Sequence, residues 1–504
     1  MKPAAQFFTE PTTEPPAPYA GFVYMPIGGD WQYGSGQKTL KDRNPFSGEM
    51  LVEIPSADRN DIDAAYRGAA EVQRSWGDAL PGERAAVMRA AAAVMEARRE
   101  EIVGWLVRES GSTRIKANLE WNAAHGVLFE AGMLPYMAKG QIVPNDIPGK
   151  ESRVYRKPVG VIGVISPWNW PLQLSMRSIA PALALGNAVV LKPASDTPIT
   201  GGLLLAKIFE EAGLPEGLLS VVVGAGSEIG DAFVCHAIPR VISFTGSTAV
   251  GRHIARQAAD APILKRVELE LGGNGPFIVL DDVDLDRAID SAIAGKFLHQ
   301  GQICMIANRF IVDTALYDQF VERFAERAGA LKVGDPDEDD TAIGPIINAS
   351  QFDRLLKHLR GARKAGAREV LGSEPHDLVL PPHVFADVTN DMPVARDELF
   401  GPIAPIIRAA NEDEALALAN ATEYGLSAAV FCGDVERGVQ FARRLEVGMA
   451  HVNDHPVNDA PFSPFGGEKN SGIGRFNGAW AVDAFTTEQW LSVQHAPRPA
   501  LFPA

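Results

Sequence analysis

The feature that most restricts the fold of this chain is a repeated alternation of short apolar runs with helical stretches. Four runs have the length and apolar character of buried strands: 159–165, 188–191, 218–223 and 241–244. A helix start at Thr197-Pro198, with Thr197 as its cap, precedes an expected helix that runs to about Ala212 and stops at Gly213. Strands that alternate with helices predict an α/β domain with a mostly parallel sheet.

A second alternation of the same kind extends from residue 276 to about residue 452. Because 504 residues exceed what one hydrophobic core usually supports, we expect two α/β domains. Residues 61–110 are rich in Ala, Arg and Glu, with apolar residues at helical spacing, and predict two or three amphipathic helices.

Two strand-like segments fit neither alternation. Residues 152–158 and 486–495 either add to the sheet of a neighbouring subunit or form edge strands within the chain. Residues 1–20 are rich in Pro, Thr and Glu and lack the basic start and apolar core of a signal peptide, so we expect a disordered extension.

The charge and cysteine content exclude several classes of partner. A net charge of −16 argues against nucleic acid and anionic membrane surfaces, and no apolar stretch is long enough to span a bilayer. Three scattered cysteines predict neither a disulfide framework nor a zinc site and favour the cytoplasm, and the histidines have no metal-binding spacing.

One cysteine has the surroundings of a reactive group. Cys304 follows a Gly-Gln turn signal, and the run Glu268-Leu269-Glu270-Leu271-Gly272-Gly273 lies upstream. A thiol and a carboxylate are the groups needed to trap an aldehyde carbon and then hydrolyse the product. Glu268 and Glu270 would share one face of a strand, so spacing alone does not choose between them.

Several expected strand ends carry groups suited to a cofactor. Ligands of parallel sheets bind at the carboxyl ends of strands, where this chain has 166–169, 192–195 and 245–248. Gly246-Ser247 opens a helix whose free N–H groups suit a phosphate. The run Gly224–Gly230 has glycines spaced one residue wider than the usual dinucleotide fingerprint, so spacing alone leaves dinucleotide binding open against a simple tight turn.

Six motifs in order resemble those of the aldehyde dehydrogenase superfamily, over residues 28–490. They are Pro167-Trp-Asn-Trp-Pro171, Phe244-Thr-Gly-Ser-Thr-Ala-Val-Gly251, Leu269-Glu-Leu-Gly-Gly273, Gly301-Gln-Ile-Cys304, Glu398-Leu-Phe-Gly-Pro402 and Pro464-Phe-Gly-Gly467. The loop at 451–459 and the segment 466–472 are most similar to the benzaldehyde and vanillin dehydrogenase branch.

The resemblance implies a three-part architecture and a homodimer or homotetramer. A Rossmann-type NAD(P)-binding domain would comprise residues 21–138 and 160–271, and an α/β catalytic domain residues 272–470. Residues 139–159 and 471–504 would form a small β oligomerisation domain.

The resemblance also implies catalytic roles. Cys304 would attack the aldehyde to give a thiohemiacetal, Asn169 with the Cys304 N–H would hold the oxyanion, and Glu270 would activate water to hydrolyse the thioester. NAD or NADP would accept the hydride, and no metal is implied. The residues expected to line the cofactor site are Pro167, Trp168, Lys192, Ser195, Gly226, Gly230, Phe244, Gly246, Ser247, Leu271, Glu398 and Phe400.

Ser195 departs from the pattern of many NAD-preferring relatives, which have a Glu at this position that binds the ribose hydroxyls. A carboxylate there would repel a 2′-phosphate, whereas a serine would not. NADP, or both cofactors, therefore becomes an option beside NAD.

An apolar slot with aromatic walls predicts an aromatic aldehyde substrate. Its expected lining is Trp170, Leu174, Arg177, Ile303, Met305, Phe462 and Phe465. Arg177 would either meet a phenol oxygen or carboxylate of the substrate or form a structural ion pair.

Three alternatives accompany this hypothesis. A medium-chain aliphatic aldehyde dehydrogenase would keep the mechanism and change the substrate. A CoA-acylating relative would lack the hydrolytic Glu270, and a non-catalytic protein on this fold would have lost at least one of Asn169, Glu270, Cys304 and Glu398, all of which are present.

Overall fold

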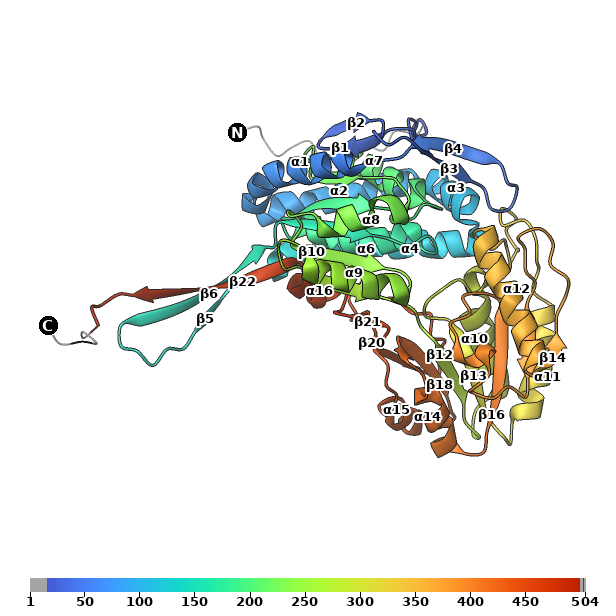
Figure 1. Cartoon of the computed structure of the whole chain (residues 1–504). Coiled ribbons are helices and arrows are strands. Elements are labelled where there is room, and N and C mark those ends of the chain that lie inside the picture. The colour runs from blue at the N-terminus through green and yellow to red at the C-terminus, as the bar shows by residue number, and fades with distance from the viewer. Residues whose placement is uncertain (1–15, 499–501, 503–504) are drawn as a thin grey trace.

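The computed structural model describes residues 16–498 and residue 502 of the chain. Figure 1 shows two lobes, each built on a sheet, and a long β arm that projects from the first lobe. Residues 1–15 of the expected disordered extension lie outside the described residues. Residues 16–20 pack on the first lobe, where the Tyr19 amide donates to Glu101 (2.6 Å) and the Arg98 guanidinium lies 3.7 Å from the Tyr19 ring centroid.

The first lobe contains a six-stranded sheet in the order β21-β11-β10-β7-β8-β9. The five strands from β11 to β9 in this order are parallel, as predicted, and β21 pairs with β11 in the antiparallel direction. The four predicted runs became β7 (Val161–Ile165), β8 (Ala188–Lys192), β9 (Leu219–Val221) and β10 (Val241–Thr245). They are joined by β11 (Arg266–Glu270) and β21 (Gly472–Ile473).

Helices cover both faces of this sheet. The predicted helices of residues 61–110 are confirmed as α1 (Arg59–Asp78), α2 (Pro81–Ala97) and α3 (Arg99–Ser110). Helices α1 and α6 both contact β7 and β8, and α6 also contacts α2 and α4. The other helices of this lobe are α4 (Arg114–Ala131), α5 (Leu134–Met137), α6 (Pro171–Ala184), α7 (Leu204–Glu211), α8 (Gly226–Cys235), α9 (Thr248–Asp260) and α16 (Gly478–Phe485).

The expected cap at Thr197 was wrong. The helix begins with a π-helical turn at Ile199–Leu203 that continues into α7. Its first N–H groups donate to the buried Glu109 carboxylate, from Ile199 at 2.7 Å and from Thr200 at 2.7 Å. A carboxylate from α3 therefore replaces the local cap, because it satisfies the same orphan donors from outside the helix.

The second lobe contains a seven-stranded sheet in the order β14-β15-β16-β13-β12-β18-β19, parallel except for β14. The strands are β12 (Gly275–Val279), β13 (Ala307–Asp313), β14 (Arg368–Leu371), β15 (His383–Ala386), β16 (Ile403–Ala409), β18 (Ser427–Phe431) and β19 (Met449–Val452). Along β12 and β13 the side chains alternate between two apolar clusters, one on each face of the sheet.

That alternation lets helices pack on both faces of the second sheet. One cluster contains residues of α10 (Leu285–Phe297) and α11 (Tyr317–Gly329). The other contains residues of α12 (Ala349–Lys364), α13 (Pro393–Arg396), α14 (Glu412–Asn420) and α15 (Val435–Ala442). A 3-10 turn, Leu298–Gly301, follows α10 and leads into the segment that carries Cys304.

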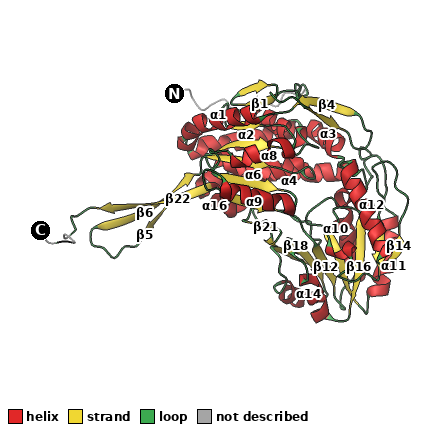
Figure 2. Ribbon diagram, in the orientation of Figure 1, coloured by secondary structure: helices red, strands yellow, loops and turns green. Residues whose placement is uncertain are grey.

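The arm is an antiparallel sheet of β5 (Gln141–Val143), β6 (Lys150–Pro158) and β22 (Thr486–Gln494), seen at the side of the molecule in Figure 2. The two unassigned segments of the sequence thus pair with each other, from Thr486 opposite Pro158 to Gln494 opposite Lys150. Within the described part of the expected oligomerisation segment 471–504, the strand that joins the arm is β22, whereas β21 pairs with β11 and α16 packs on α5 and α6.

Three two-stranded ribbons complete the described structure. They are β1 (Met25–Ile27) with β2 (Asp30–Gln32), β3 (Thr39–Arg43) with β4 (Met50–Pro55), and β17 (Tyr424–Gly425) with β20 (Glu468–Lys469). Among the described residues, no helix combines the length and apolar character that a bilayer crossing requires.

Candidate active site

Cys304 and Glu270 meet between the two lobes. Glu270 ends β11 of the first sheet, and Cys304 lies on the segment between the 3-10 turn and β13 of the second. The Cys304 thiol donates to Glu270 Oε1 across 3.2 Å. The fold therefore chooses between the two carboxylates that spacing left open, since Glu268 lies against Gly474 instead.

Glycines allow these two segments to approach. A Cβ on Gly273 would lie 2.2 Å from the Cys304 carbonyl oxygen, and one on Gly272 would lie 2.6 Å from Glu398. Gly301 has φ +73°, and its Cβ would meet the Gly401 carbonyl at 2.4 Å. Side chains at these positions would push Glu270, Glu398 and Cys304 apart, which explains the glycines in both motifs.

The thiol is protonated in this arrangement. Burial raises the pKa of Cys304 well above its usual range, and the neighbouring Glu270 carboxylate raises it further. A cysteine needs an adjacent base to become a nucleophile under these conditions, and the bonded Glu270 oxygen supplies one.

Arg177 holds the other oxygen of Glu270. Its guanidinium lies 2.8 Å from Glu270 Oε2 and 3.2 Å from Asp459 Oδ2, and both the Arg177 and the Glu270 side chains are fully buried. The guanidinium carbon lies 4.2 Å from the centroid of Phe465 and 4.8 Å from that of Phe476. Of the two roles expected for Arg177, the structure shows the ion pair, and its partner is the carboxylate beside the thiol.

Asn169 reaches the same place from the loop between β7 and α6. Its side-chain amide donates to the Gln302 carbonyl across 3.0 Å, and its side chain lines the cavity that contains Cys304. A primary amide has two N–H donors, so one remains for an oxygen bound in the cavity.

A cavity of about 530 Å³ leads to Cys304. The predicted residues Trp170, Leu174, Arg177, Ile303, Met305 and Phe465 line it. The expectation for Phe462 was wrong, because its side chain lies outside this lining and is 67% exposed.

Sequence reasoning missed much of the cavity wall. Gln173 precedes the predicted residue Arg177 by four positions on α6, so helical spacing would have found it. Most other missed residues come from other elements, and no local signal marks them: Thr113, Ile115, Leu119, Ala123, Ile293, Ala294, Phe297, Leu298, Leu331 and Ala342.

The residues expected to bind a cofactor gather at the carboxyl ends of parallel strands. Pro167 and Trp168 follow β7, Lys192 ends β8, and Ser195 follows on its loop. Phe244, Gly246 and Ser247 lie at the end of β10, Leu271 follows β11, and Gly226 and Gly230 belong to the first two turns of α8.

These strand ends have donors that suit a dinucleotide. Ser247 caps α9, whose N-terminal N–H groups favour a phosphate. Lys192 is buried, and its ammonium donates to the Pro193 carbonyl (3.0 Å) with further hydrogens free for a ribose. Burial lowers the pKa of Lys192 to about 8.

Glu398 and Phe400 come from the second lobe. The Trp168 and Phe400 rings meet edge to face with centroids 5.3 Å apart, so the two lobes share this site. The Gly273 N–H donates to Glu398 (2.8 Å), and burial raises the pKa of Glu398 to about 7. Glu398 is thus half-buried and bonded to the backbone of the glycine segment, unlike its exposed neighbour Arg396.

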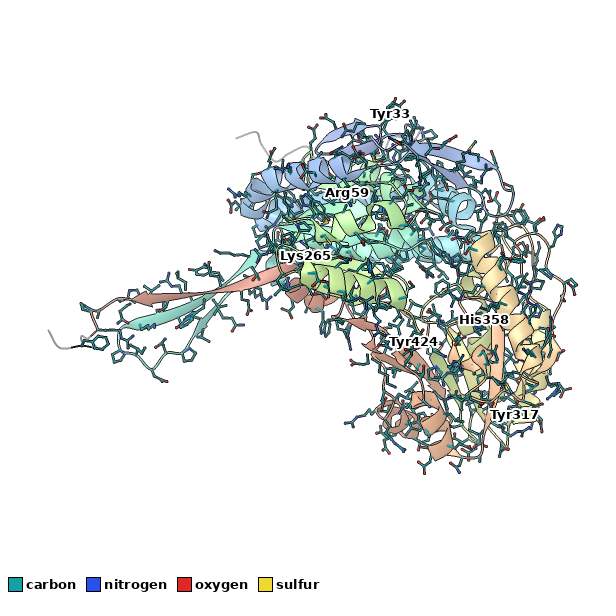
Figure 3. All side chains as sticks on the ribbon, viewed as in Figure 1. Tyr33, Arg59, Lys265, Tyr317, His358 and Tyr424 are labelled. Carbon is teal, nitrogen blue, oxygen red and sulfur yellow. The ribbon has the colours of Figure 1, made fainter. Side chains whose placement is uncertain are left out.

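A second cavity opens beside Glu398. It is lined by basic residues of α12, including Arg354, Lys357 and Arg360, together with His358 and Tyr424, which Figure 3 labels. The positive charge at this opening suits an anionic ligand such as a dinucleotide.

Known proteins match this chain over most of its length. The family model described as the aldehyde dehydrogenase family matches residues 31–491. A vanillin dehydrogenase of Corynebacterium glutamicum is 51% identical over 93% of this chain and 97% of its own. A crystal structure of an NAD-dependent benzaldehyde dehydrogenase from Corynebacterium glutamicum matches with a TM-score of 0.89 and 47% identity, covering 96% of this chain and 99% of that one.

A third match has its substrate in the crystal. The structure of a salicylaldehyde dehydrogenase from Pseudomonas putida G7 complexed with salicylaldehyde has a TM-score of 0.92 and 36% identity. It covers 95% of this chain and 99% of that chain.

Proposed function

The chain belongs to the aldehyde dehydrogenase family, and from that premise we propose that it oxidises an aromatic aldehyde to the carboxylic acid with NAD or NADP. The observation that carries this proposal is the contact between Glu270 and Cys304, whose side chain lines a largely apolar cavity. Vanillin, benzaldehyde and salicylaldehyde dehydrogenases among the similar proteins support the aromatic substrate class.

The first half of the reaction uses the thiol and the amide. Glu270 takes the proton of Cys304, and the sulfur forms a bond to the aldehyde carbon while the carbonyl π pair moves to oxygen. The free N–H of Asn169 and the Cys304 N–H stabilise that oxyanion. A nicotinamide held at the cofactor site would supply the oxidant, a hydride acceptor, so that the adduct on Cys304 becomes a thioester when the aldehyde hydrogen leaves with its two electrons.

The second half uses the carboxylate as a base towards water. After Glu270 has passed the proton taken from Cys304 to solvent water, it accepts a proton from a second water molecule, whose oxygen attacks the thioester carbon. The C–S bond breaks, the acid leaves, and the thiolate of Cys304 recovers a proton. Arg177 keeps the Glu270 carboxylate within reach of the thiol throughout, because it binds the oxygen that does not face Cys304.

The shape of the cavity supports a ring-bearing substrate. Trp170, Phe297 and Phe465 supply aromatic surface, and aliphatic side chains fill most of the remaining wall. Flat apolar walls with a few polar groups near Cys304 fit an aromatic ring whose aldehyde points to that residue.

For the cofactor, Lys192 would contact the adenosine ribose, and Trp168, Gly226, Gly246 and Ser247 would line the pyrophosphate and adenosine region. Glu398 would bind the nicotinamide ribose, with Phe400 packed beside it. Because Ser195 has no carboxylate to repel a 2′-phosphate, we propose that NADP is accepted beside NAD.

We also propose the roles of the domains and of the arm that the resemblance implies. Residues 21–138 and 160–271 bind the cofactor, residues 272–470 carry Cys304, and the arm joins subunits into a homodimer or homotetramer. Trp490 and Ile142 of the arm are 63% and 76% exposed, which suits a surface covered by another subunit. The three cysteines have free thiols in the structure, which suits a reducing cytoplasm.

Initial rates with benzaldehyde, vanillin and hexanal, each with NAD and with NADP, test the proposal through the absorbance of the reduced cofactor. We expect the aromatic aldehydes to be turned over with the higher kcat/KM and the free acid to be the product. Fast turnover of hexanal with little aromatic activity would refute the aromatic substrate and keep the mechanism. Formation of an acyl-CoA in place of the acid when CoA is added would refute the hydrolytic step.

A further inference from the structure

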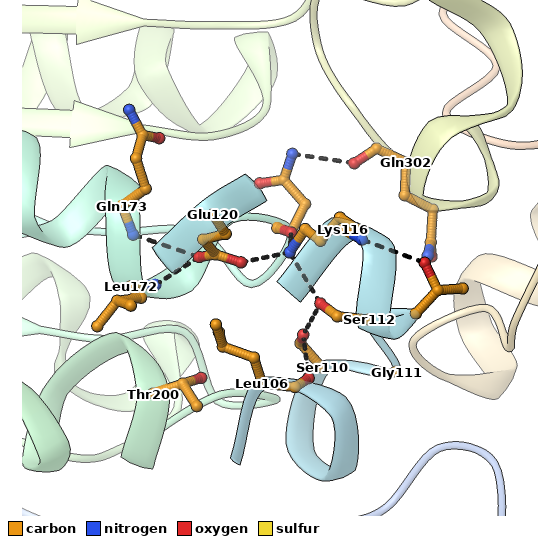
Figure 4. Close-up of polar contacts among 12 residues, drawn as sticks. Leu106, Ser110, Gly111, Ser112, Lys116, Glu120, Leu172, Gln173, Thr200 and Gln302 are labelled. Atoms are coloured by element: carbon orange, nitrogen blue, oxygen red, sulfur yellow. Dashed lines mark hydrogen bonds and ion pairs between the residues drawn. The ribbon is translucent and has the colours of Figure 1, made fainter. Parts of the chain in front are cut away.

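A buried ion pair lies behind the candidate oxyanion site. Lys116 and Glu120, one turn apart on α4, are both fully buried, and Lys116 Nζ lies 2.5 Å from Glu120 Oε2. The ammonium also donates to Ser112 Oγ across 2.9 Å, and Ser112 in turn bonds Ser110 (2.7 Å). Figure 4 shows this chain of contacts.

Both members of the pair bind the turn that carries Asn169. Lys116 Nζ donates to the Asn169 carbonyl across 2.7 Å and lies 4.9 Å from the centroid of the Trp170 ring. Glu120 Oε1 accepts the N–H groups of Leu172 (2.8 Å) and Gln173 (3.2 Å), the first turn of α6. The ion pair thus fixes the backbone of residues 169–173 from one side.

The carboxylate replaces a missing cap. Trp170 is the N-cap residue of α6 and has no side-chain bond to the helix N–H groups. A carboxylate at a helix N-terminus satisfies those donors and complements the helix dipole. Glu120 therefore also determines where α6 begins, and with it the position of Trp170 in the cavity wall.

Asn169 is held at both ends. Lys116 binds its backbone carbonyl, and its side-chain amide donates to the Gln302 carbonyl beside Cys304. These two contacts fix the orientation of the Asn169 side chain, and with it the direction in which the second N–H of its amide points. Without the ammonium, the carbonyl would be a buried acceptor with no partner, and the peptide would rotate to find one.

Stability alone gives no reason for this arrangement. A buried ion pair is often no more stable than apolar residues of the same volume, because desolvation offsets the attraction between the charges. A misplacement of about 1 Å at a reacting group, in contrast, costs on the order of 10²-fold in rate.

We propose that Lys116, with Glu120 as its partner, is a positioning residue that orients the oxyanion donor Asn169 and the wall residue Trp170. This inference rests on the proposed aldehyde oxidation and deepens it. Lys116 acts through Asn169 and does not itself touch the substrate.

The test replaces the pair by a neutral one of similar volume, Lys116→Met with Glu120→Gln, which keeps an acceptor for the first N–H groups of α6. We expect kcat to fall about 10- to 100-fold, since a whole oxyanion donor is worth ~10²–10³. KM should change much less than kcat, and the melting temperature should stay near that of the wild type.

A double-mutant cycle with Asn169→Ala separates positioning from general weakening. If Lys116 acts through Asn169, the neutral pair lowers kcat in the wild-type background and has little further effect in the Asn169→Ala background. An equal loss in both backgrounds, or an unchanged kcat in the wild-type background, overturns the inference. If the first variant does not accumulate as folded protein, Lys116→Gln with Glu120→Gln keeps a donor near the carbonyl and enters the same cycle with a smaller expected loss.

A matched control neutralises another largely buried pair of the same lobe. Arg98→Met with Glu101→Gln removes an ion pair of 2.9 Å at the junction of α2 and α3, and neither residue lines the cavity of Cys304, so the change should alter the melting temperature but not kcat. All rates are taken with the aldehyde that the wild-type enzyme oxidises fastest. Failure of every aromatic aldehyde then counts against the proposed substrate, whereas a wild-type kcat in the neutral pair counts against Lys116 alone.

Discussion

The two sides of Cys304 are built in different ways. On the substrate side the thiol, the carboxylate and the amide have partners within the chain: Glu270 binds Arg177 and the thiol, Arg177 also binds Asp459, and Asn169 binds Gln302. The Trp170 indole N–H and the Arg177 Nε–H are the exceptions, since neither has a partner in the part of the chain that the structure describes. On the cofactor side the buried polar groups have fewer partners among the described residues. Lys192 donates to one carbonyl, Glu398 accepts one N–H, and the buried Ser166 hydroxyl has none.

The difference shows how the work of a bisubstrate site is divided. The groups that perform chemistry are oriented by the protein in advance, which removes reorganisation from the reaction itself. The groups that hold a large polar ligand keep unused donors and acceptors, because the ligand completes their hydrogen bonds. Changes on the substrate side should therefore alter kcat, and changes on the cofactor side should alter the KM of the cofactor.

The largest expected effect is that of Cys304→Ala, which removes the bond to the substrate carbon. We expect aldehyde oxidation to fall by roughly 10⁴-fold or more, as for other nucleophiles that act as part of a unit. Cofactor binding, followed by the fluorescence of the reduced cofactor, should stay near that of the wild type. Dehydrogenase activity that survives this substitution would contradict the covalent mechanism.

The second prediction concerns the ion pair behind Glu270. Arg177→Met leaves Glu270 and Asp459 without their shared partner, and breaking a fully buried pair destabilises a protein by about 3–5 kcal/mol. Arg177 also holds the pKa of Cys304 below the value that burial and Glu270 alone would give. Its removal should raise that pKa further, so the fraction of thiolate falls at neutral pH and the profile of kcat/KM shifts to higher pH.

Arg177→Lys is the matched control for this prediction. It keeps the charge and loses the two-pronged geometry, so it should recover more of the stability than of kcat. Denaturant unfolding and the pH profile of kcat/KM provide the two readouts. A pH profile that does not move in Arg177→Met would mean that the guanidinium only stabilises the fold.

The same comparison explains what could be predicted from the sequence. The strands β7, β8 and β10 and the cofactor residues at their ends follow from local apolar runs and from the rule that parallel strands end at one edge. The ion pair of Arg177 with Glu270 could not be predicted, because it joins residues 93 positions apart on a helix and a strand. Phe462 was misplaced for a related reason, since an aromatic near Phe465 in sequence need not share its orientation.

The family motifs identified some site residues that local sequence patterns could not. They singled out Glu270 over Glu268, and the structure gives the physical reason in the glycines that follow it. The Lys116–Glu120 pair stayed hidden, since in the sequence two opposite charges one turn apart are typical of an exposed helix face.

A third, smaller effect should appear on the cofactor side as a dependence on pH. Burial raises the pKa of Glu398 to about 7, so the carboxyl is ionised above this value and protonated below it. A carboxylate accepts hydrogen bonds from ribose hydroxyls more strongly than the neutral acid does. The KM for NAD should therefore rise as the pH falls through about 7, by roughly tenfold for the loss of one charge-assisted hydrogen bond.

Glu398→Gln isolates this effect. Its KM for NAD should be high at every pH and should lack the step near neutrality, while the KM for the aldehyde keeps its wild-type dependence. The same step in the variant and in the wild type would assign the titration to another group, such as Lys192, whose pKa burial lowers to about 8.

The smallest expected effect concerns the choice between cofactors, and it tests whether the cofactor side is as adjustable as its unused groups suggest. Ser195→Glu introduces a carboxylate where a 2′-phosphate would lie, and the repulsion between two fully hydrated unit charges about 4 Å apart amounts to about 1 kcal/mol. The ratio of kcat/KM for NADP to that for NAD should therefore fall roughly five- to tenfold, with kcat for NAD unchanged. Ser195→Gln adds the same bulk without the charge and should leave the ratio near that of the wild type. If both variants lower the ratio of kcat/KM for NADP to that for NAD equally, the volume of the side chain and not its charge restricts the binding of the 2′-phosphate. The cofactor side would then be packed as closely as the substrate side.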